Sequence, residues 1–203
     1  MQSLEAKPLL LDVHSITLRV THEEFEKLCE DNPDRSFELT ATGELIVMAP
    51  AGWESSERNL SLGTDVEIWN RQTKLGRAFD SSGGFTLPNG AVRSPDVTWI
   101  EKSKLANVPA GVKFPQVIPD FVIELRSDTD SPEERLRQRM PKLREKMEEY
   151  RSNGVRLGWL IDPQKQQVEI YRLGQDVEVL QSPTILGGED VLPGFTLDLG
   201  SIL

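Results

Sequence analysis

The stretch PDFVIEL, at residues 119–125, decides the fold that we expect for this chain. Nearly every position in it is apolar, which is typical of a strand that is buried on both faces of a sheet. The stretch VRLGWLIDP, at residues 155–163, has the same character. The two stretches therefore predict two buried strands in the core of the molecule.

A helical pattern lies between these two strands. It begins with the acidic and capping residues of SDTDSPEERL, at residues 127–136, restarts at Met140-Pro141 and continues to Arg151. After the second buried strand, residues 166–172 and 177–181 alternate between apolar and polar side chains. They predict a further pair of strands.

The N-terminal half is expected to form a helix, a hairpin and a second helix. Thr21 and Glu24 have the spacing of a capping box, which predicts that a short helix starts there. Residues 37–50 have the pattern of a β-hairpin. Residues 54–74 show the apolar recurrence of a helix, and Gly76 is expected to end it.

Residues 76–103 are interrupted by turn residues, among them Asn89-Gly90, and predict a β-meander. The order of the elements fits a mixed, partly antiparallel sheet flanked by helices, and it does not fit regular βαβ alternation. We therefore expect an α/β or α+β fold. Since the chain has 203 residues and no evident linker or repeat, we expect a single domain over residues 1–203.

Composition narrows the class of protein. Hydrophobic residues make up 37% of the chain and charged residues 28%, as in ordinary soluble domains. No apolar run approaches the roughly 20 residues that cross a membrane, and the N-terminus lacks a secretory pattern, so we expect a cytoplasmic protein. The single cysteine, Cys29, and the two histidines, His14 and His22, match no zinc site. Any bound metal would therefore have oxygen ligands, which favours Mg²⁺ or Mn²⁺ over zinc.

The net charge of −10 argues against a protein whose whole surface binds nucleic acid. Basic residues nevertheless gather between Arg135 and Lys146, where glutamates interrupt them. This segment is either a local basic surface or a solvated helix with ion pairs between successive turns.

Two acidic residues lie in or beside predicted buried strands, where burial of a carboxylate is energetically unfavourable. Asp96 directly precedes the apolar segment 97–100, and Glu124 interrupts the first buried strand. Burial of either requires a metal, a cation or a hydrogen-bond donor, and one divalent ion would satisfy both. Asp96 could instead be a strand-end residue that accepts backbone hydrogen bonds. Glu124 could instead pair with Arg126 or Arg93.

A lysine beside these carboxylates would complete a site for phosphodiester hydrolysis. Arg126 follows Glu124 by two residues, but an arginine stays protonated and is a poor proton acceptor. On the next helix, Lys142, Lys146 and Tyr150 share one face. That face could lie over the end of the strand that bears Glu124.

Four segments occur in order along roughly residues 37–172, namely FELTATGELIVMAP, RSPDVTWI, PDFVIELRS, and KMEEYRSNGVRLGWLIDP followed by QQVEIYR. They resemble the Uma family of restriction-endonuclease-like proteins, which is placed in the PD-(D/E)XK nuclease superfamily. The resemblance implies a restriction-endonuclease-like core over residues 37–172, extended by the N-terminal helix and a C-terminal strand.

The resemblance also implies roles for individual residues. The aspartate of the family's SPD motif falls on Asp96, and the glutamate of its VIEL strand falls on Glu124; these are the two expected metal ligands. Its helical lysine falls on Lys146, although the longer segment before this helix leaves Lys142 as an alternative. Its early glutamate falls on Glu38, which would add a ligand or position a water.

Two hypotheses about function follow. In the first, the protein is a Mg²⁺- or Mn²⁺-dependent DNA endonuclease, a hydrolase whose site residues act as the resemblance implies. A homodimer would then gather the basic helices into one groove. In the second, the protein is a catalytically silent binding or regulatory module, and the same residues form a salt-bridged cluster without metal.

Three of the four tryptophans, Trp69, Trp99 and Trp159, fall in periodic apolar segments and are expected to pack in the core. Trp53 opens the segment WESSE close to the expected site, where it could contact the substrate.

Overall fold

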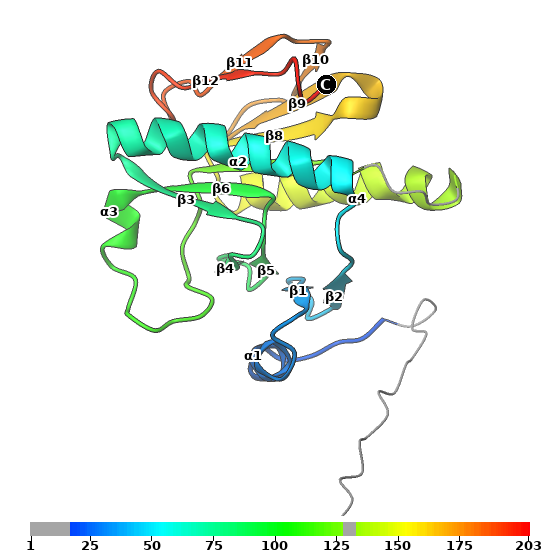
Figure 1. Cartoon of the computed structure of the whole chain (residues 1–203). Helices are drawn as coiled ribbons and strands as arrows, with labels where there is room; N and C mark the ends of the chain where they lie inside the picture. The colour runs from blue at the N-terminus through cyan, green and yellow to red at the C-terminus, as the bar shows by residue number, and fades with distance from the viewer. Residues whose placement is uncertain (1–16, 128–132) are drawn as a thin grey trace, which may run out of the picture.

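The computed structural model describes residues 17–127 and 133–203, with the side chains of residues 133–139 outside this description. A large sheet lies between two long helices, and a smaller sheet with its own short helix lies below it (Figure 1). The mixed sheet flanked by helices that the order of elements predicted is confirmed.

The large sheet has six strands in the order β10-β9-β8-β7-β6-β3. Their bounds are β3 (Gly76–Asp80), β6 (Val97–Glu101), β7 (Phe121–Leu125), β8 (Leu157–Asp162), β9 (Gln167–Arg172) and β10 (Glu178–Gln181). Strands β7 and β8 pair in parallel, and the other neighbours pair antiparallel. The two buried strands predicted from their apolar sequences are thus adjacent at the centre of this sheet.

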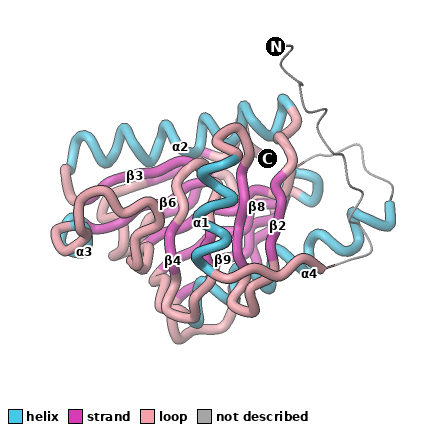
Figure 2. The backbone as a smooth tube through the Cα atoms, turned by 90° about the horizontal axis from the view of Figure 1, so that it is seen from below, coloured by secondary structure: helices cyan, strands magenta, loops and turns pink. Residues whose placement is uncertain are grey.

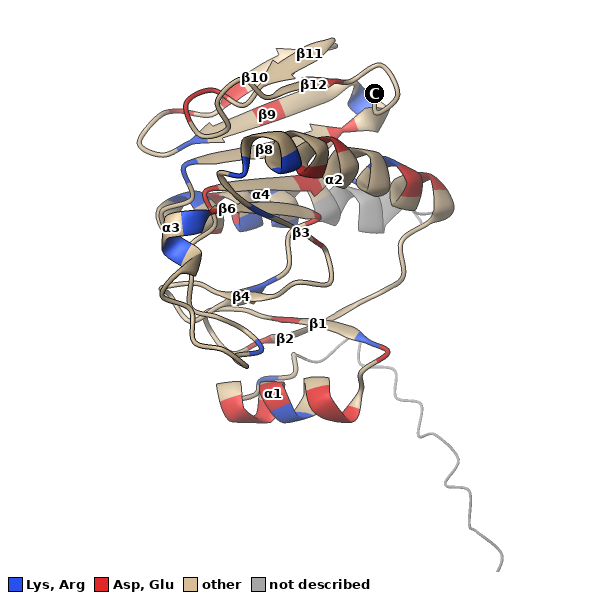
Figure 3. Ribbon diagram, turned by 60° about the vertical axis from the view of Figure 1, so that its left-hand side comes forward, with Lys and Arg blue, Asp and Glu red and all other residues tan. Residues whose placement is uncertain are grey.

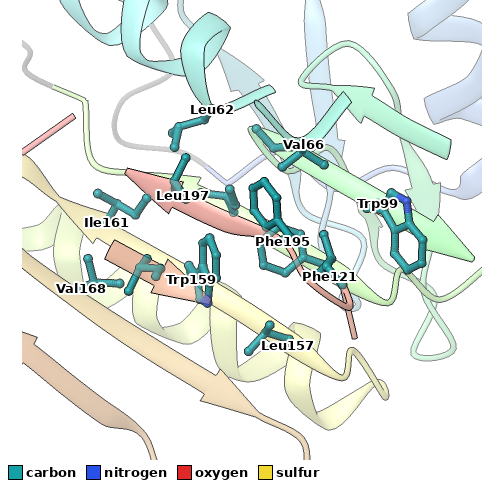
Figure 4. Packing of buried hydrophobic residues seen from close by; sticks show 14 of the residues in the cluster. Leu62, Val66, Trp99, Phe121, Leu157, Trp159, Ile161, Val168, Phe195 and Leu197 are labelled. Atoms are coloured by element: carbon teal, nitrogen blue, oxygen red, sulfur yellow. The ribbon is translucent and has the colours of Figure 1, made fainter. Parts of the chain in front are cut away.

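Helix α2 (Trp53–Thr73) covers one face of the large sheet and helix α4 (Glu133–Ser152) covers the other (Figures 1 and 2). Successive side chains of β7 therefore pack alternately against α2 and against α4. Phe121 and Ile123 belong to the apolar cluster that contains Leu62 and Val66 of α2. Figure 4 shows this packing around Phe121, Trp159 and Phe195. Val122 instead packs with the side chains of α4, so Glu124, two residues further on, faces α4 as well.

The small sheet has the order β2-β1-β5-β4. It contains β1 (Ser36–Leu39), β2 (Leu45–Met48), β4 (Phe85–Thr86) and β5 (Val92–Arg93). Helix α1 (His22–Asp31) packs on it through Phe25, which contacts Leu39 and Val92 in a separate apolar cluster. The capping box of Thr21 and Glu24 is confirmed at the start of α1.

The remaining elements are short. They are α3 (Lys102–Leu105), a 3-10 turn (Pro163–Lys165), β11 (Ile185–Gly187) and β12 (Thr196–Asp198). Strands β11 and β12 form a hairpin beside α2, where the indole of Trp69 donates a hydrogen bond of 3.1 Å to the carbonyl of Pro193.

Two expectations, about residues 76–103 and about helix α4, need correction. Residues 76–103 do not form one meander, because β4 and β5 pair in the small sheet while β3 pairs with β6. Helix α4 runs without a restart through Pro141. The start expected at residues 127–136 falls largely on residues 128–132, which lie outside the described ranges.

Helix α2 does not end at Gly76. Lys74 caps it in the left-handed conformation, with φ of 57°, and Gly76 is the first residue of β3. A side chain at Gly76 would place its Cβ 2.2 Å from the carbonyl oxygen of Ile100 and 2.6 Å from the Trp99 ring. This glycine is therefore required for close strand packing and not for helix termination.

The three tryptophans that were predicted to pack in the core are buried. They are Trp69, Trp99 and Trp159, and Trp53 is exposed at the beginning of α2. Cys29 is a free, partly buried thiol that packs in the cluster under α1. In the described residues, no helix combines the length and the apolar character needed to cross a membrane.

Candidate functional site

A polar cluster lies where the two sheets and helix α4 meet. The ammonium nitrogen of Lys146 lies 2.8 Å from Oε1 of Glu38 and 2.8 Å from Oε1 of Glu124. Asp96 stands beside Glu124, since the backbone N–H of Leu125 donates to its Oδ2 at 2.8 Å. The structure thus brings together the four residues that the sequence put forward.

Strand pairing accounts for the meeting of the two strand-borne acids. Strands β6 and β7 run antiparallel, with Val97 opposite Ile123. Asp96 and Glu124 are each one residue further along, at the same end of the pair. Because backbone pairing fixes this end, the two carboxylates are neighbours whether or not a ligand is present.

Helix α4 contributes side chains from successive turns. Lys146 and Tyr150 are four residues apart, and both contact Glu124: the Tyr150 hydroxyl donates to Oε1 at 2.9 Å. Glu149 points to the small sheet, where its Oε2 accepts a hydrogen bond of 2.6 Å from Nε of Arg93. Lys142, the alternative lysine, is exposed, so Lys146 is the one that the structure brings to the carboxylates.

The small sheet holds Glu38 from the other side. Its Oε1 accepts the backbone N–H of Ser94 at 2.9 Å, and its Oε2 accepts Nη1 of Arg93 at 3.1 Å. Arg93 therefore links Glu38 on β1 to Glu149 on α4. Only 2% of the surface of Glu38 is exposed, so these charge-assisted bonds stabilise a carboxylate that water hardly reaches.

Arg126 lies outside this cluster. Its Nη1 binds both carboxylate oxygens of Asp162, at 2.9 and 2.8 Å. The simpler explanation that Glu124 pairs with Arg126 or Arg93 is therefore wrong, because Lys146 and Tyr150 are its partners among the described residues.

Sequence reasoning missed Asn59 and Glu149, and it named Arg93 only as a partner of Glu124. Asn59 on α2 donates from Nδ2 to Oδ1 of Asp96 at 3.1 Å, while Arg93 and Glu149 form the link described above. Their partners are far away in the chain, so no local pattern identifies them. For Glu149, the one available signal was its place on the turn of helix that also carries Lys146 and Tyr150.

The pKa of one of the three carboxylates is lowered, and the pKa values of the other two are raised. Burial opposes ionisation of Glu38, but Lys146 and Arg93 outweigh burial and hold its pKa below the usual range. Burial raises the pKa of Glu124 to about 7; Lys146 works against this rise, and Asp96 and Glu38 add to it. Burial likewise raises the pKa of Asp96, against the Leu125 amide. The strand-borne pair therefore has less positive charge nearby than it needs.

The raised pKa of Glu124 predicts a specific dependence of stability on pH. Its ordinary value is 4.5 and its value in the folded protein is about 7, so the folded state binds more protons between these values. Stability from this group is thus complete below about pH 4.5 and is lost as the pH rises to about 7. We expect Glu124→Gln to remove this loss. From pH 4.5 to pH 8 the variant should gain about 3 kcal/mol in free energy of unfolding relative to wild type.

Urea unfolding in EDTA at the two pH values measures this difference. Glu26→Gln is the control, because it makes the same change at an exposed glutamate of α1, away from the cluster. A difference between Glu124→Gln and wild type that is the same at both pH values would contradict the assignment.

The donor set fits a hard divalent cation. Mg²⁺ is commonly bound by one or two carboxylates, with waters and substrate phosphates completing its shell, and Asp96 and Glu124 supply two carboxylates. Oδ1 of Asn59 is buried and has no hydrogen-bond partner in the described part of the chain, although its amide contacts Asp96. Among the residues whose side chains are described, no group of three or more His, Cys, Asp and Glu is arranged so that it could hold a metal ion. The protein would thus supply only part of the coordination shell.

Basic and acidic residues are interspersed in the described part of the chain. Lysines and arginines alternate with acidic residues along the described ribbon, and α1 is strongly acidic (Figure 3). Of the basic segment 135–146, Arg144 pairs with Glu169 at 2.5 Å, and Lys146 lies in the cluster. The side chains of Arg135, Arg137 and Arg139 lie outside the description.

Comparison with known proteins gives a family match and a structural match. The model of the family Uma2, described as “Putative restriction endonuclease”, matches residues 22–200. The fold is similar to a solved structure described as “a putative nuclease belonging to DUF820 from Anabaena variabilis ATCC 29413”, with a TM-score of 0.73 and 22% sequence identity, over 90% of this chain and 96% of that one. At this identity the likeness concerns the fold alone. No curated protein matches the chain.

Proposed function

The chain belongs to the Uma2 family, whose model matches almost its whole length, and from this premise we propose that it is a cytoplasmic Mg²⁺- or Mn²⁺-dependent endonuclease that hydrolyses DNA phosphodiester bonds. One observation supports the proposal above others. Asp96 and Glu124 stand side by side at one end of the β6–β7 pair, and the ammonium group of Lys146 lies against Glu124. Phosphodiester hydrolysis needs this combination of carboxylates and positive charge.

In the proposed site, Asp96 and Glu124 hold the divalent cation. Such a cation supplies positive charge beside the scissile phosphate and favours ionisation of an attacking water. The backbone N–H of Leu125 fixes one oxygen of Asp96, and the hydroxyl of Tyr150 fixes one oxygen of Glu124. These bonds orient the ligands before any substrate arrives.

Lys146 acts as a fixed positive charge. Burial favours its neutral amine, but Glu124 and Glu38 outweigh burial and raise its pKa, so it stays protonated at neutral pH. It therefore donates hydrogen bonds, to a water or to a phosphate oxygen, and does not accept a proton. Glu38, itself held by Arg93 and Ser94, keeps the ammonium group at the edge of the proposed metal site.

A catalytically silent module is the second candidate, and it too has a specific observation in its favour. The ammonium nitrogen of Lys146 lies 2.8 Å from both Glu38 and Glu124, so these two carboxylates form salt bridges that do not require a metal. Under this reading the cluster joins α4 to the two sheets and performs no chemistry.

Thermal stability with Mn²⁺ separates the two candidates. If Asp96 and Glu124 bind the ion, wild type should gain about 2.7 kcal/mol when free Mn²⁺ is a hundredfold above its dissociation constant. Asp96→Ala should lose this gain, because one of two protein ligands is gone. Asp31→Ala, which removes an exposed carboxylate from α1, should keep it. Equal responses of wild type and Asp96→Ala would favour the silent module.

The nucleic-acid substrate is tested separately. Single-stranded, double-stranded and branched DNA are incubated with the protein in Mg²⁺, in Mn²⁺ and in EDTA. We expect cleavage of at least one of these DNAs with the metals and none with the chelator. If the protein binds Mn²⁺ through Asp96 but cleaves none of these DNAs, the result would support the metal site and contradict DNA as the substrate.

A further inference from the structure

Helix α2 carries exposed apolar side chains on the face that points away from the large sheet. Trp53, Leu60 and Ile68 are 77%, 72% and 50% exposed. The helix forms an outer layer of the molecule in two perpendicular views (Figures 1 and 2). Its inner face is already used, since Leu62 and Val66 lie in the core. Apolar side chains gathered on one exposed face commonly mark an interaction surface.

The outward residues follow a regular spacing, with each three or four positions from the next. In order they are Trp53, Glu57, Leu60, Thr64, Ile68 and Arg71, and Leu75 follows just after the helix ends. All seven are exposed. The six residues within α2 lie along one side of the helix because of this spacing, and together with Leu75 at its end they are here called the α2 stripe.

Residues at equal distances on either side of Thr64 in the α2 stripe are either both apolar or opposite in charge. Leu60 and Ile68 are each four residues from Thr64, and Glu57 and Arg71 are each seven residues from it. Reversing the helix about Thr64 therefore sets apolar against apolar and acidic against basic. Trp53 and Leu75, each eleven residues from Thr64, exchange places at the two ends.

We propose that the α2 stripe is the contact surface between two copies of this chain. A surface that complements its own reverse is what a two-fold symmetric dimer requires, because each patch meets the same patch of its partner. The two α2 helices would pack antiparallel, with the symmetry axis at Thr64. Leu60 would pack on the partner's Ile68, and Glu57 would face the partner's Arg71.

Present contacts leave these groups available. Arg71 pairs at 2.8 Å with Glu67 of its own helix, but 77% of its side chain is exposed, and a surface pair of this kind contributes little. A guanidinium group has five N–H donors, so it can bind Glu67 and a partner's glutamate together. The α2 stripe shares no residue with the Asp96–Glu124 cluster, so the dimer does not rest on the proposed nuclease function.

The dimer should be weak. One pair of helices buries less surface than a standard interface, so we expect a dissociation constant between about 1 µM and 1 mM. The monomer–dimer equilibrium is therefore measured by sedimentation equilibrium over this concentration range.

Charge reversal tests both the surface and its register. Glu57→Arg sets two guanidinium groups against each other at both symmetric positions, and Arg71→Glu does the same with carboxylates. We expect each single change to weaken the dimer by about tenfold or more. The double variant E57R/R71E restores opposite charges across the axis and should return the dissociation constant to near the wild-type value.

Glu23→Arg is the matched control, because it makes the same charge change on an exposed residue of α1. It should dimerise like wild type, and circular dichroism should show unchanged helix in all variants. A wild-type protein that stays monomeric to millimolar concentration would overturn the proposal. So would a dimer that survives the single changes, or single changes that the double variant fails to reverse.

Discussion

Replacing Lys146 with methionine is expected to destabilise the protein by about 3–5 kcal/mol, because two buried carboxylates lose the cation between them. Methionine has a similar volume, so the change removes charge and leaves the packing largely intact. Glu38 keeps Arg93 and Ser94 as partners, whereas Glu124 keeps Tyr150. Most of the cost should therefore fall on Glu124, whose pKa should rise further.

Thermal unfolding measures this effect. A loss of this size in a chain of 203 residues should lower the melting temperature by roughly 10 °C at neutral pH. Lys142→Met is the control, since Lys142 is exposed one turn earlier on α4. Its melting temperature should stay close to that of wild type. A Lys146→Met variant as stable as this control would mean that Lys146 does not bridge the carboxylates in solution.

Replacing Asp96 with asparagine is expected to reduce metal-dependent DNA cleavage by more than about 100-fold. Loss of groups that only support metal ligands costs 10- to 100-fold, and Asp96 is proposed to be a ligand itself. Asparagine has the same shape, and its carbonyl can still accept the N–H of Leu125. The variant should therefore fold, and its defect should lie in the chemistry.

Initial rates of cleavage under excess Mg²⁺ test this expectation, with Asp31→Asn as a control on an exposed aspartate of α1. Circular dichroism and thermal unfolding establish that both variants are folded. Cleavage by Asp96→Asn at the wild-type rate would exclude Asp96 as a ligand, whatever the structure brings near it.

Part of the site follows from local sequence. Asp96 and Glu124 each stand beside apolar strand residues, where a carboxylate needs a partner, and this signal alone identified both. The phase of helix α4 puts Lys146 and Tyr150 on one face, and the structure brings that face to Glu124. Their roles in catalysis remain predictions.

Other parts required tertiary information. Arg93 contacts Glu38 and Glu149 from 55 and 56 residues away in the chain, so neither contact leaves a trace in local periodicity. Glu38 was identified only through the family resemblance. Asn59 sits on a helix whose pattern is explained by packing, and its contact with Asp96 depends on how α2 lies over the sheet.

The fold shows the same division between local and distant information. The apolar runs predicted β7 and β8, because burial on both faces dictates composition directly. The assignment of short strands to sheets was wrong for residues 76–103, since turn residues show where a chain reverses and not which strand it joins. The role of Gly76 was predicted wrongly for a related reason. A glycine is required there because the Trp99 side chain and the Ile100 carbonyl, on the next strand of the sheet, leave no room for a Cβ atom.

A crystal soaked in Mn²⁺ provides the most direct test of the central claim, that Asp96 and Glu124 form one divalent-cation site beside Lys146. The proposal predicts a single anomalous peak between about 2.0 and 2.4 Å from a carboxylate oxygen of each acid. It would be contradicted by crystals in which no ion lies between these two carboxylates and Lys146 still bridges Glu38 and Glu124.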